Sequence, residues 1–332
     1  MNHVNMRLRI AHVPYTQGLP DQLVSSLVWN GQQGVQIFFA VSGFLITTTA
    51  LRRWGSGIDI PAFYRFRFAR IAPLLLLLLV ILSSLDLAQV KNFVINPKVA
   101  TLPRALLAAL TFHVNVLEAG HGYLPANWDI LWSLSVEEVF YLIFPLVRRY
   151  QKLFIGLLLA CVVAGPFSRM HGNEIWREYS YLGGMDAIAL GCLTALLVQK
   201  IQWPPRILIA LGAALMIFTL CFSRTADKLG LGFSMSILAI GTCFIIAASA
   251  QTQWTSPRIL RPLLSLGQRS YEVYLTHMFV VFAFFELFLK TGKQMRAVPL
   301  FFVATILVSG FLGEAVARLY SEPMNDFLRK KR

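Results

Sequence analysis

The chain is short of charged residues, and acidic residues are the scarcer kind. Of its 332 residues, 14% are charged and 56% are hydrophobic, whereas a soluble protein has about 25% charged and about 45–50% apolar residues. Because so few polar side chains cannot cover a soluble core of this size, many apolar residues must face lipid. The composition therefore excludes an ordinary soluble enzyme and predicts a membrane protein.

The shortage of acidic residues leaves a large positive charge. Lys and Arg together number 30 against 16 Asp and Glu, for a net charge of +14. In a membrane protein, excess Lys and Arg usually mark cytoplasmic loops and contacts with anionic lipid headgroups. We therefore expect membrane lipids, and no nucleic acid, among the partners of this chain.

Cysteine is scarce as well. The four cysteines each fall in a different apolar run and lack CxxC spacing; they are Cys161, Cys192, Cys221 and Cys243. Disulfide frameworks and structural metal sites need regularly paired or closely spaced cysteines. We expect neither of them, and no metal or permanently bound cofactor.

Long apolar runs are abundant. A helix that crosses a bilayer needs about 20 apolar residues. Nine runs come near that length, at 34–50, 70–90, 133–147, 153–167, 181–199, 204–222, 231–250, 270–289 and 298–319. A weaker apolar piece at 104–118 contains polar residues, and we interpret it as a re-entrant or interfacial segment. The predicted fold is an all-α, polytopic helical membrane bundle.

Basic residues predict the orientation of this bundle. If the spans alternate in direction, five segments lie on the same side of the membrane, and each of them contains Lys or Arg. They are 51–69, 148–152, 200–203, 251–269 and 320–332. We place these segments, and with them the C-terminus, in the cytoplasm. Nine spans then put the polar N-terminus outside without a signal peptide. We therefore expect a first helix to be missing upstream of Met1, and residues 1–332 to form one integral membrane domain.

Three arginines gather before the second long apolar run. Arg65, Arg67 and Arg70 follow a short loop, and Arg67 and Arg70 share a helix face because they are one turn apart. Guanidinium groups pair bidentately with phosphate, so this basic elbow is a candidate site for a phosphorylated ligand at the membrane surface. The alternative is anchoring to lipid headgroups, the usual role of isolated arginines at a helix start.

Acidic residues open the third apolar run. Ser133 and Glu137 lie four residues apart on one helix face, just after Trp132. A carboxylate inside a membrane is costly and usually functional, so Glu137 is a candidate catalytic residue, with capping of the helix N-terminus as the alternative. For the adjacent Glu138 we favour capping.

Two other stretches place polar residues in apolar helices. Tyr274 and His277 lie on one face near the start of a span, just after Tyr271. Their shared face predicts a polar cavity, although a lone histidine in a helix is more often a packed core residue. Ser42 is a further candidate inside the first apolar run. Next to Gly43, it is equally compatible with close packing of small residues.

Together these stretches resemble the membrane acyltransferase family 3, also called the O-acyltransferase or O-acetyltransferase family. The second helix of that family is similar to GVQIFFAVSGFLI, and its paired-arginine elbow to FYRFRFARIAP. Its later motifs are similar to LWSLSVEEVFYLIFPL and SYEVYLTH, and its last-helix ending to SEPM. Each motif is weak alone, but the set occurs in order over nearly the whole chain.

The resemblance implies ten helices, about nine of them present, and transfer of an acyl group, usually acetyl from acetyl-CoA, to a hydroxyl. The implied acceptors are surface polysaccharide, lipopolysaccharide or another glycan, and the implied location is the bacterial inner membrane. The essential histidine of the family matches His3, as base or transient acyl carrier. Glu137 would orient that histidine, and the basic elbow would hold the CoA phosphates. Gln36 stands where the family often has Asp, so no role is carried over to it.

A transporter or flippase of a lipid-linked glycan or small anion is the competing interpretation. Such a protein also needs many spans, buried charges and basic loops, but it would move its substrate without consuming CoA. The inverted repeats of many transporters are not visible in this sequence. A catalytically silent membrane protein is a third interpretation.

Overall fold

The structure is a computed structural model that describes residues 1–20, 24, 26, 28–55, 57–222, 231–252, 256–292 and 294–330. Every regular element in these residues is helical. The helices are α1 (Asn2–Ile10), α3 (Gly31–Trp54), α4 (Ile60–Leu87), α5 (Leu102–Leu110), α6 (Val114–His121), α7 (Ala126–Asp129), α8 (Leu131–Arg148), α9 (Gln151–Ser168), α10 (Glu174–Tyr179), α11 (Tyr181–Leu197), α12 (Pro205–Cys221), α14 (Leu231–Gln251), α15 (Arg261–Gln268), α16 (Ser270–Lys290), α17 (Val298–Val316) and α18 (Glu322–Lys330). Short 3₁₀ turns precede α15 and α17, and a π-helical turn joins α17 to α18.

The predicted polytopic bundle is confirmed. Within the described residues, 8 helical segments are long and apolar enough to cross a membrane. The remaining predicted span forms α12, which is apolar but has only 17 residues. The piece at 104–118 divides into the short helices α5 and α6, and neither is long enough to cross a bilayer.

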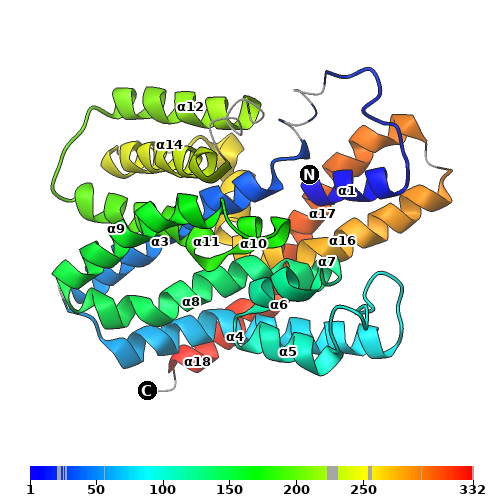
Figure 1. Ribbon diagram of the computed structural model, residues 1–332, viewed down its shortest axis with the longest axis horizontal. Coiled ribbons are helices and arrows are strands. Elements are labelled where there is room, and N and C mark those ends of the chain that lie inside the picture. Colours follow the sequence, from blue (N-terminus) through cyan, green and yellow to red (C-terminus); the bar gives the residue numbers. More distant parts are fainter. Residues whose placement is uncertain are drawn as a thin grey trace.

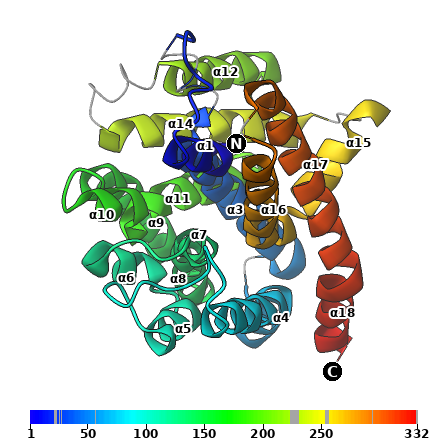
Figure 2. The ribbon, with the colours of Figure 1, turned by 90° about the vertical axis from the view of Figure 1, so that its right-hand side faces the viewer.

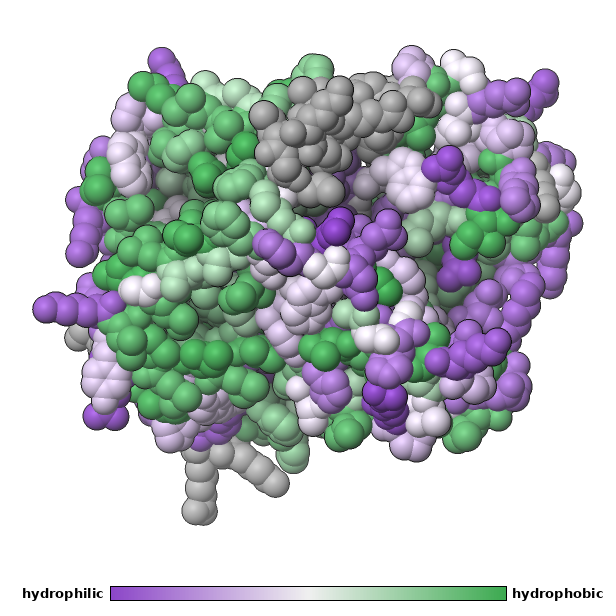
Figure 3. Space-filling view, viewed as in Figure 1, coloured by the Kyte–Doolittle hydropathy of each residue, from purple (hydrophilic) through white to green (hydrophobic). Residues whose placement is uncertain are grey.

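The long helices run roughly side by side along the longest axis of the molecule (Figure 1). The connections after α3, α8 and α11 gather at one end, on the left of that view, and α1 lies toward the other end. Seen along the bundle, α12 and α14 lie at the top, α4 and α5 at the bottom, and α3 toward the middle (Figure 2). Hydrophobic side chains gather over the left-hand part of the face in Figure 3, and hydrophilic ones are frequent toward its right-hand end.

Glycines allow α3 and α11 to pack closely at the centre of the bundle. A Cβ added at Gly43 would overlap the Ile188 carbonyl oxygen, and one at Gly191 would overlap the Ala40 carbonyl oxygen. Small residues at helix crossings let backbones approach in this way. Gly43 therefore serves helix packing, as the alternative interpretation of this stretch expects.

A buried ion pair joins α9 to α11 in the same region. The Arg169 guanidinium makes two bonds to the Asp186 carboxylate, of 2.7 and 3.0 Å, and Asp186 is fully buried. Ser236 of α14 and Gln36 of α3 also donate to that carboxylate, at 2.6 and 2.8 Å. Because an unpaired charge in apolar surroundings is costly, this network links four helices of the core.

The start of α4 follows from local sequence. Asp59 is the N-cap, and its carboxylate accepts a hydrogen bond of 3.0 Å from the Ala62 amide. Pro61 lies in the first turn, where its missing N–H removes no intrahelical bond. The helix therefore begins before the basic elbow and presents its arginines on regular helical turns.

Substitution of Gly191 tests the α3–α11 contact. We expect Gly191→Ala to destabilise the protein by about 1–3 kcal/mol, since the added methyl must push two backbones apart. Gly156→Ala is the matched control, because a Cβ there meets no atom within 4 Å. That control gains helix propensity of up to about 1 kcal/mol. Thermal unfolding in detergent would contradict the packing role of Gly191 if the two variants melted alike.

Candidate functional site

Most of the predicted site residues lie in three contact groups that follow one another through the bundle. Ser133 leads to Glu137, and Arg67 to Arg70, along one helical turn each and not by a side-chain contact. The members of these groups are His3, His277, Tyr274, Ser133, Glu137, Ser42, Tyr141, Arg67, Glu138, Arg70 and Glu272. They come from α1, α16, α8, α3 and α4, which are distant in sequence. We call this set the polar chain.

Two histidines form one end of the polar chain. The His3 ring of α1 lies beside the His277 ring of α16, with 5.2 Å between ring centroids. His277 Nδ1 is 2.6 Å from the Tyr274 carbonyl oxygen. Because a carbonyl can only accept, Nδ1 carries a proton, and in the neutral ring Nε2 is then an acceptor.

The His3 imidazole is set up as a neutral base. Burial, the neighbouring His277 and nearby positive charges, including Arg7, lower the pKa of His3 to about 3. The ring is therefore uncharged at neutral pH, and one of its two nitrogens can accept a proton. The packing of α1 against α16, with the Arg7 guanidinium 4.4 Å from the centre of the Phe282 ring, holds His3 in this position.

Tyr274 carries the polar chain from α16 to α8. Its hydroxyl donates to the Ile130 carbonyl oxygen at 2.8 Å and lies 2.7 Å from the Ser133 hydroxyl. Ser133 is one helical turn before Glu137. The two faces that the sequence indicated, one on α8 and one on α16, therefore meet.

Glu137 lies in the middle of the polar chain and is buried. Its carboxylate accepts a hydrogen bond from the Ser42 hydroxyl, which in turn lies 2.5 Å from the Tyr141 hydroxyl. The Arg67 guanidinium is 3.2 Å from the same carboxylate. The structure therefore pairs the Glu137 carboxylate with Ser42 and Arg67. The ring beside His3 is that of His277, so orientation of His3 by Glu137 stays a prediction.

Glu138 was expected to cap a helix, and that expectation is wrong. It lies two turns inside α8 and forms an ion pair with Arg67, whose Nε is 2.9 Å from the carboxylate. The Arg67 guanidinium also lies 4.0 Å from the centre of the Tyr141 ring. The cause is tertiary, because α4 brings its arginine against the face of α8 that carries both glutamates.

The Arg70 guanidinium is engaged in the same way. It makes two hydrogen bonds, of 2.7 and 3.1 Å, to the carboxylate of Glu272, which is fully buried. The adjacent Tyr271 donates to the Ile71 carbonyl oxygen at 2.8 Å and so ties α16 to α4. Sequence reasoning left Glu272 out of the site, although an acid inside an apolar span was a signal that could have found it.

The basic elbow is therefore divided. Arg67 and Arg70 face carboxylates inside the bundle, with 19% and 29% of their side-chain surface exposed, whereas Arg65 is exposed. Binding of a phosphate by the two inner arginines requires that it share them with these carboxylates. Their role toward a phosphorylated ligand stays a prediction.

Trp132 lies beside the polar chain and is packed against an aromatic partner. Its ring stacks on Tyr179 of α10, with centroids 4.1 Å apart and planes 4° apart. Tyr179 donates to Asp129 at 3.1 Å. Burial and the charge of Asp129 raise the pKa of Glu118 well above its ordinary value. No motif in the sequence indicated that these two acidic residues would lie close together.

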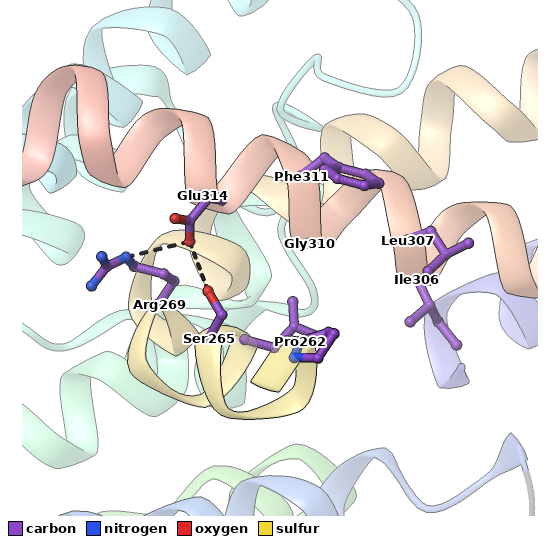
Figure 4. A pocket seen from close by; sticks show the side chains of 9 residues that line it. Pro262, Ser265, Arg269, Ile306, Leu307, Gly310, Phe311 and Glu314 are labelled. Carbon is purple, nitrogen blue, oxygen red and sulfur yellow. Dashed lines mark hydrogen bonds and ion pairs between the residues drawn. The ribbon is translucent and has the colours of Figure 1, made fainter. Parts of the chain in front are cut away.

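A surface hollow lies away from the predicted site residues, between α15 and α17 (Figure 4). Apolar side chains line most of it, and Arg269 and Ser265 interact with Glu314 at its polar end, at 3.5 and 3.0 Å. No group of His, Cys, Asp and Glu side chains suited to hold a metal ion occurs in the part of the chain that the structure describes.

The ion pair of Arg70 and Glu272 can be tested by a double-mutant cycle. We expect Arg70→Gln to destabilise the protein by about 3–5 kcal/mol, because it leaves a buried carboxylate unpaired. Arg70→Gln combined with Glu272→Gln should recover much of that loss. Unfolding in detergent measures both effects, and additive losses in the double variant would contradict the pairing.

Comparison with known proteins places this chain in a family. O-acetyltransferase OatA of Staphylococcus aureus (strain NCTC 8325) is 26% identical over 350 residues, which cover 91% of this chain and 53% of that protein. The putative O-acetyltransferase SACOL0978 of S. aureus (strain COL) is 25% identical over 303 residues, covering 79% and 48%. The chain spans about half the length of these curated relatives, and no solved structure matches it significantly.

The family comparison covers nearly all of the helical bundle. A family model described as an acyltransferase domain matches residues 3–314, from the helix that carries His3 to the last long apolar helix. All members of the polar chain fall within the matched residues. The chain therefore belongs to acyltransferase family 3.

Proposed function

We propose that this chain is a membrane O-acetyltransferase that moves an acetyl group from acetyl-CoA to a hydroxyl of a cell-surface glycan. The observation that carries the proposal is the polar chain, which has a buried histidine pair at one end and arginines paired with glutamates at the other. Membership in acyltransferase family 3 and the O-acetyltransferase names of its relatives support the same reaction class.

His3 is the candidate base of this reaction. The acceptor hydroxyl oxygen attacks the thioester carbonyl carbon, a C–O bond forms and the C–S bond breaks. The hydroxyl proton passes to the imidazole, and the departing thiolate takes up a proton to leave as a thiol. A neutral imidazole can take up this proton, because one of its two ring nitrogens has a free lone pair.

Glu137 and its partners fit a positioning role at the middle of the path. The Ser42 hydroxyl and the Arg67 guanidinium fix the orientation of its carboxylate, and the Tyr141 hydroxyl contacts Ser42. A fixed charge costs no reorganisation when charge develops on the reacting groups. We therefore place the acyl carbonyl between this carboxylate and the histidine pair, with Tyr274 and Ser133 lining the path.

The two ends of the polar chain suit different substrates. In our topology the end with Arg67 and Arg70 faces the cytoplasm, where acetyl-CoA is available, and the end with His3 faces outward, where a glycan is available. The C-terminus is then cytoplasmic, and the membrane is the bacterial inner membrane. A surface polysaccharide or lipopolysaccharide is the proposed acceptor.

The experiment that tests this function follows radiolabelled acetyl-CoA in membranes that contain the chain. We expect label on cell-surface glycan together with an equal amount of released CoA, and a loss of about 10²–10⁴-fold in His3→Ala, the range for a lost general base. His171→Ala, at an exposed position, is the matched control and should keep the activity. Glycan movement without CoA release would favour a transporter and contradict the proposal.

The pH dependence of the transfer gives a separate prediction. A histidine with the ordinary pKa of 6.5 would lose its function as a base as pH falls through 6.5, whereas His3, with its pKa near 3, stays unprotonated. We therefore expect no loss of kcat between about pH 8 and about pH 5, the range in which an ordinary histidine titrates. A fall in kcat centred near pH 6.5 would contradict a buried His3 acting as the base.

A further inference from the structure

A basic cluster surrounds one aromatic ring outside the polar chain. The guanidinium carbon of Arg53 lies 4.3 Å from the centre of the Phe66 ring, that of Arg329 lies 5.3 Å from it, and that of Arg65 lies 5.4 Å from it. The Trp54 ring packs beside Phe66, with centroids 6.4 Å apart. We call these five residues the Phe66 cluster.

The cluster is assembled from three separate parts of the chain. Arg53 and Trp54 end α3, Phe66 and Arg65 lie in the second turn of α4, and Arg329 is near the end of α18. The helix α18 packs against α4, which brings the C-terminal end of the described chain under the elbow (Figure 1). Cation–π contacts of this kind hold each arginine near the ring.

The charge of the Phe66 cluster differs from that of the polar chain. Arg67 and Arg70 each bind glutamate carboxylates. The positive charges of Arg53 and Arg70 repel that of Arg329, and Asp326 of the same helix attracts it. Like charges gathered at one place repel each other, and a bound anion with several phosphate groups would offset this repulsion.

The position of the cluster identifies which anion fits. Phe66 is the neighbour of Arg67 in the sequence, and Arg70 lies one turn further along α4, so the cluster adjoins the arginine end of the polar chain. Its three arginines are exposed, and in our topology they lie on the cytoplasmic side. A ligand held there by its phosphates can extend a chain along α4 toward Glu137.

We propose that the Phe66 cluster binds the adenosine 3′-phosphate and 5′-diphosphate end of the acyl-CoA donor. This inference rests on the proposed function and adds a site for the part of the donor that carries most of the negative charge. Arg53, Arg65 and Arg329 pair with the phosphates, because guanidinium groups bind phosphate bidentately. The thioester end then lies toward the polar chain, where Arg67 and Arg70 keep their carboxylate partners.

An anionic lipid headgroup offers the same phosphate chemistry, so the test must separate the two sources. The full chain is placed in nanodiscs of phosphatidylcholine, and the binding of CoA, 3′-dephospho-CoA and pantetheine is measured directly. Association with phosphatidylglycerol vesicles is measured in parallel. The variants are Arg53→Gln, Arg329→Gln and Phe66→Leu. Arg206→Gln, an exposed arginine at the start of α12, is the matched control for loss of one positive charge.

We expect Arg53→Gln and Arg329→Gln each to weaken CoA binding about tenfold, the effect of losing one charge-assisted hydrogen bond to phosphate. Phe66→Leu should weaken it as well, because the arginines lose the ring that holds them together. At least one arginine variant should lose less affinity for 3′-dephospho-CoA than for CoA. Pantetheine binding should change in none of the variants, and Arg206→Gln should bind all ligands as the unaltered chain does.

Three results would overturn the inference. One is CoA binding that is unchanged in the arginine variants. If these variants lose only their association with phosphatidylglycerol, the cluster is a lipid headgroup site. Another is an equal loss for CoA, 3′-dephospho-CoA and pantetheine, which would indicate a general structural defect. The third is an unaltered chain that binds no CoA at all, which would contradict both the proposed acetyl-CoA donor and its binding by the cluster. The first two results would contradict the inference alone and leave the proposed function intact.

Discussion

Ion pairs between helices are the interactions on which the rest of this structure depends. Arginines of α4 pair with glutamates of α8 and α16, and Arg169, directly after α9, pairs with an aspartate of α11. The buried partners, such as Glu272 and Asp186, have no exposed surface. Because a carboxylate without a partner is very costly in apolar surroundings, a helix that carries such a residue can pack only where its arginine lies.

These pairs also determine where the polar chain forms. Once α4 is held against α8 and α16, the face of α8 that carries Ser133 and Glu137 lies opposite the face of α16 that carries Tyr274. Hydroxyl groups then link the two faces, and α1 completes the set with His3. Some side chains, such as those of Glu137 and Arg67, therefore belong both to the stabilising ion pairs and to the candidate active site. The ion pairs hold each carboxylate in one orientation.

Arginines on the same helix have two different surroundings. Those that point into the bundle are neutralised by glutamates, whereas Arg65 lies at the surface with the arginines that α3 and α18 contribute around Phe66. Arginines of the first kind hold the helices together, and those of the second kind can bind a charged ligand. This division explains how the elbow can serve both stability and recognition without one use removing the other.

The apolar runs and their length were sufficient to predict a helical membrane bundle, because crossing a bilayer requires a certain number of apolar residues whatever the packing. The motifs likewise indicated Ser42, Glu137, Tyr274 and His277, since polar residues in apolar helices are conspicuous. The sequence did not reveal which of these side chains touch. It assigned Glu138 to capping and left Arg329 apart from the elbow, because both contacts join segments far apart in the chain. Only the packing of whole helices brings such residues together, and local patterns do not encode it.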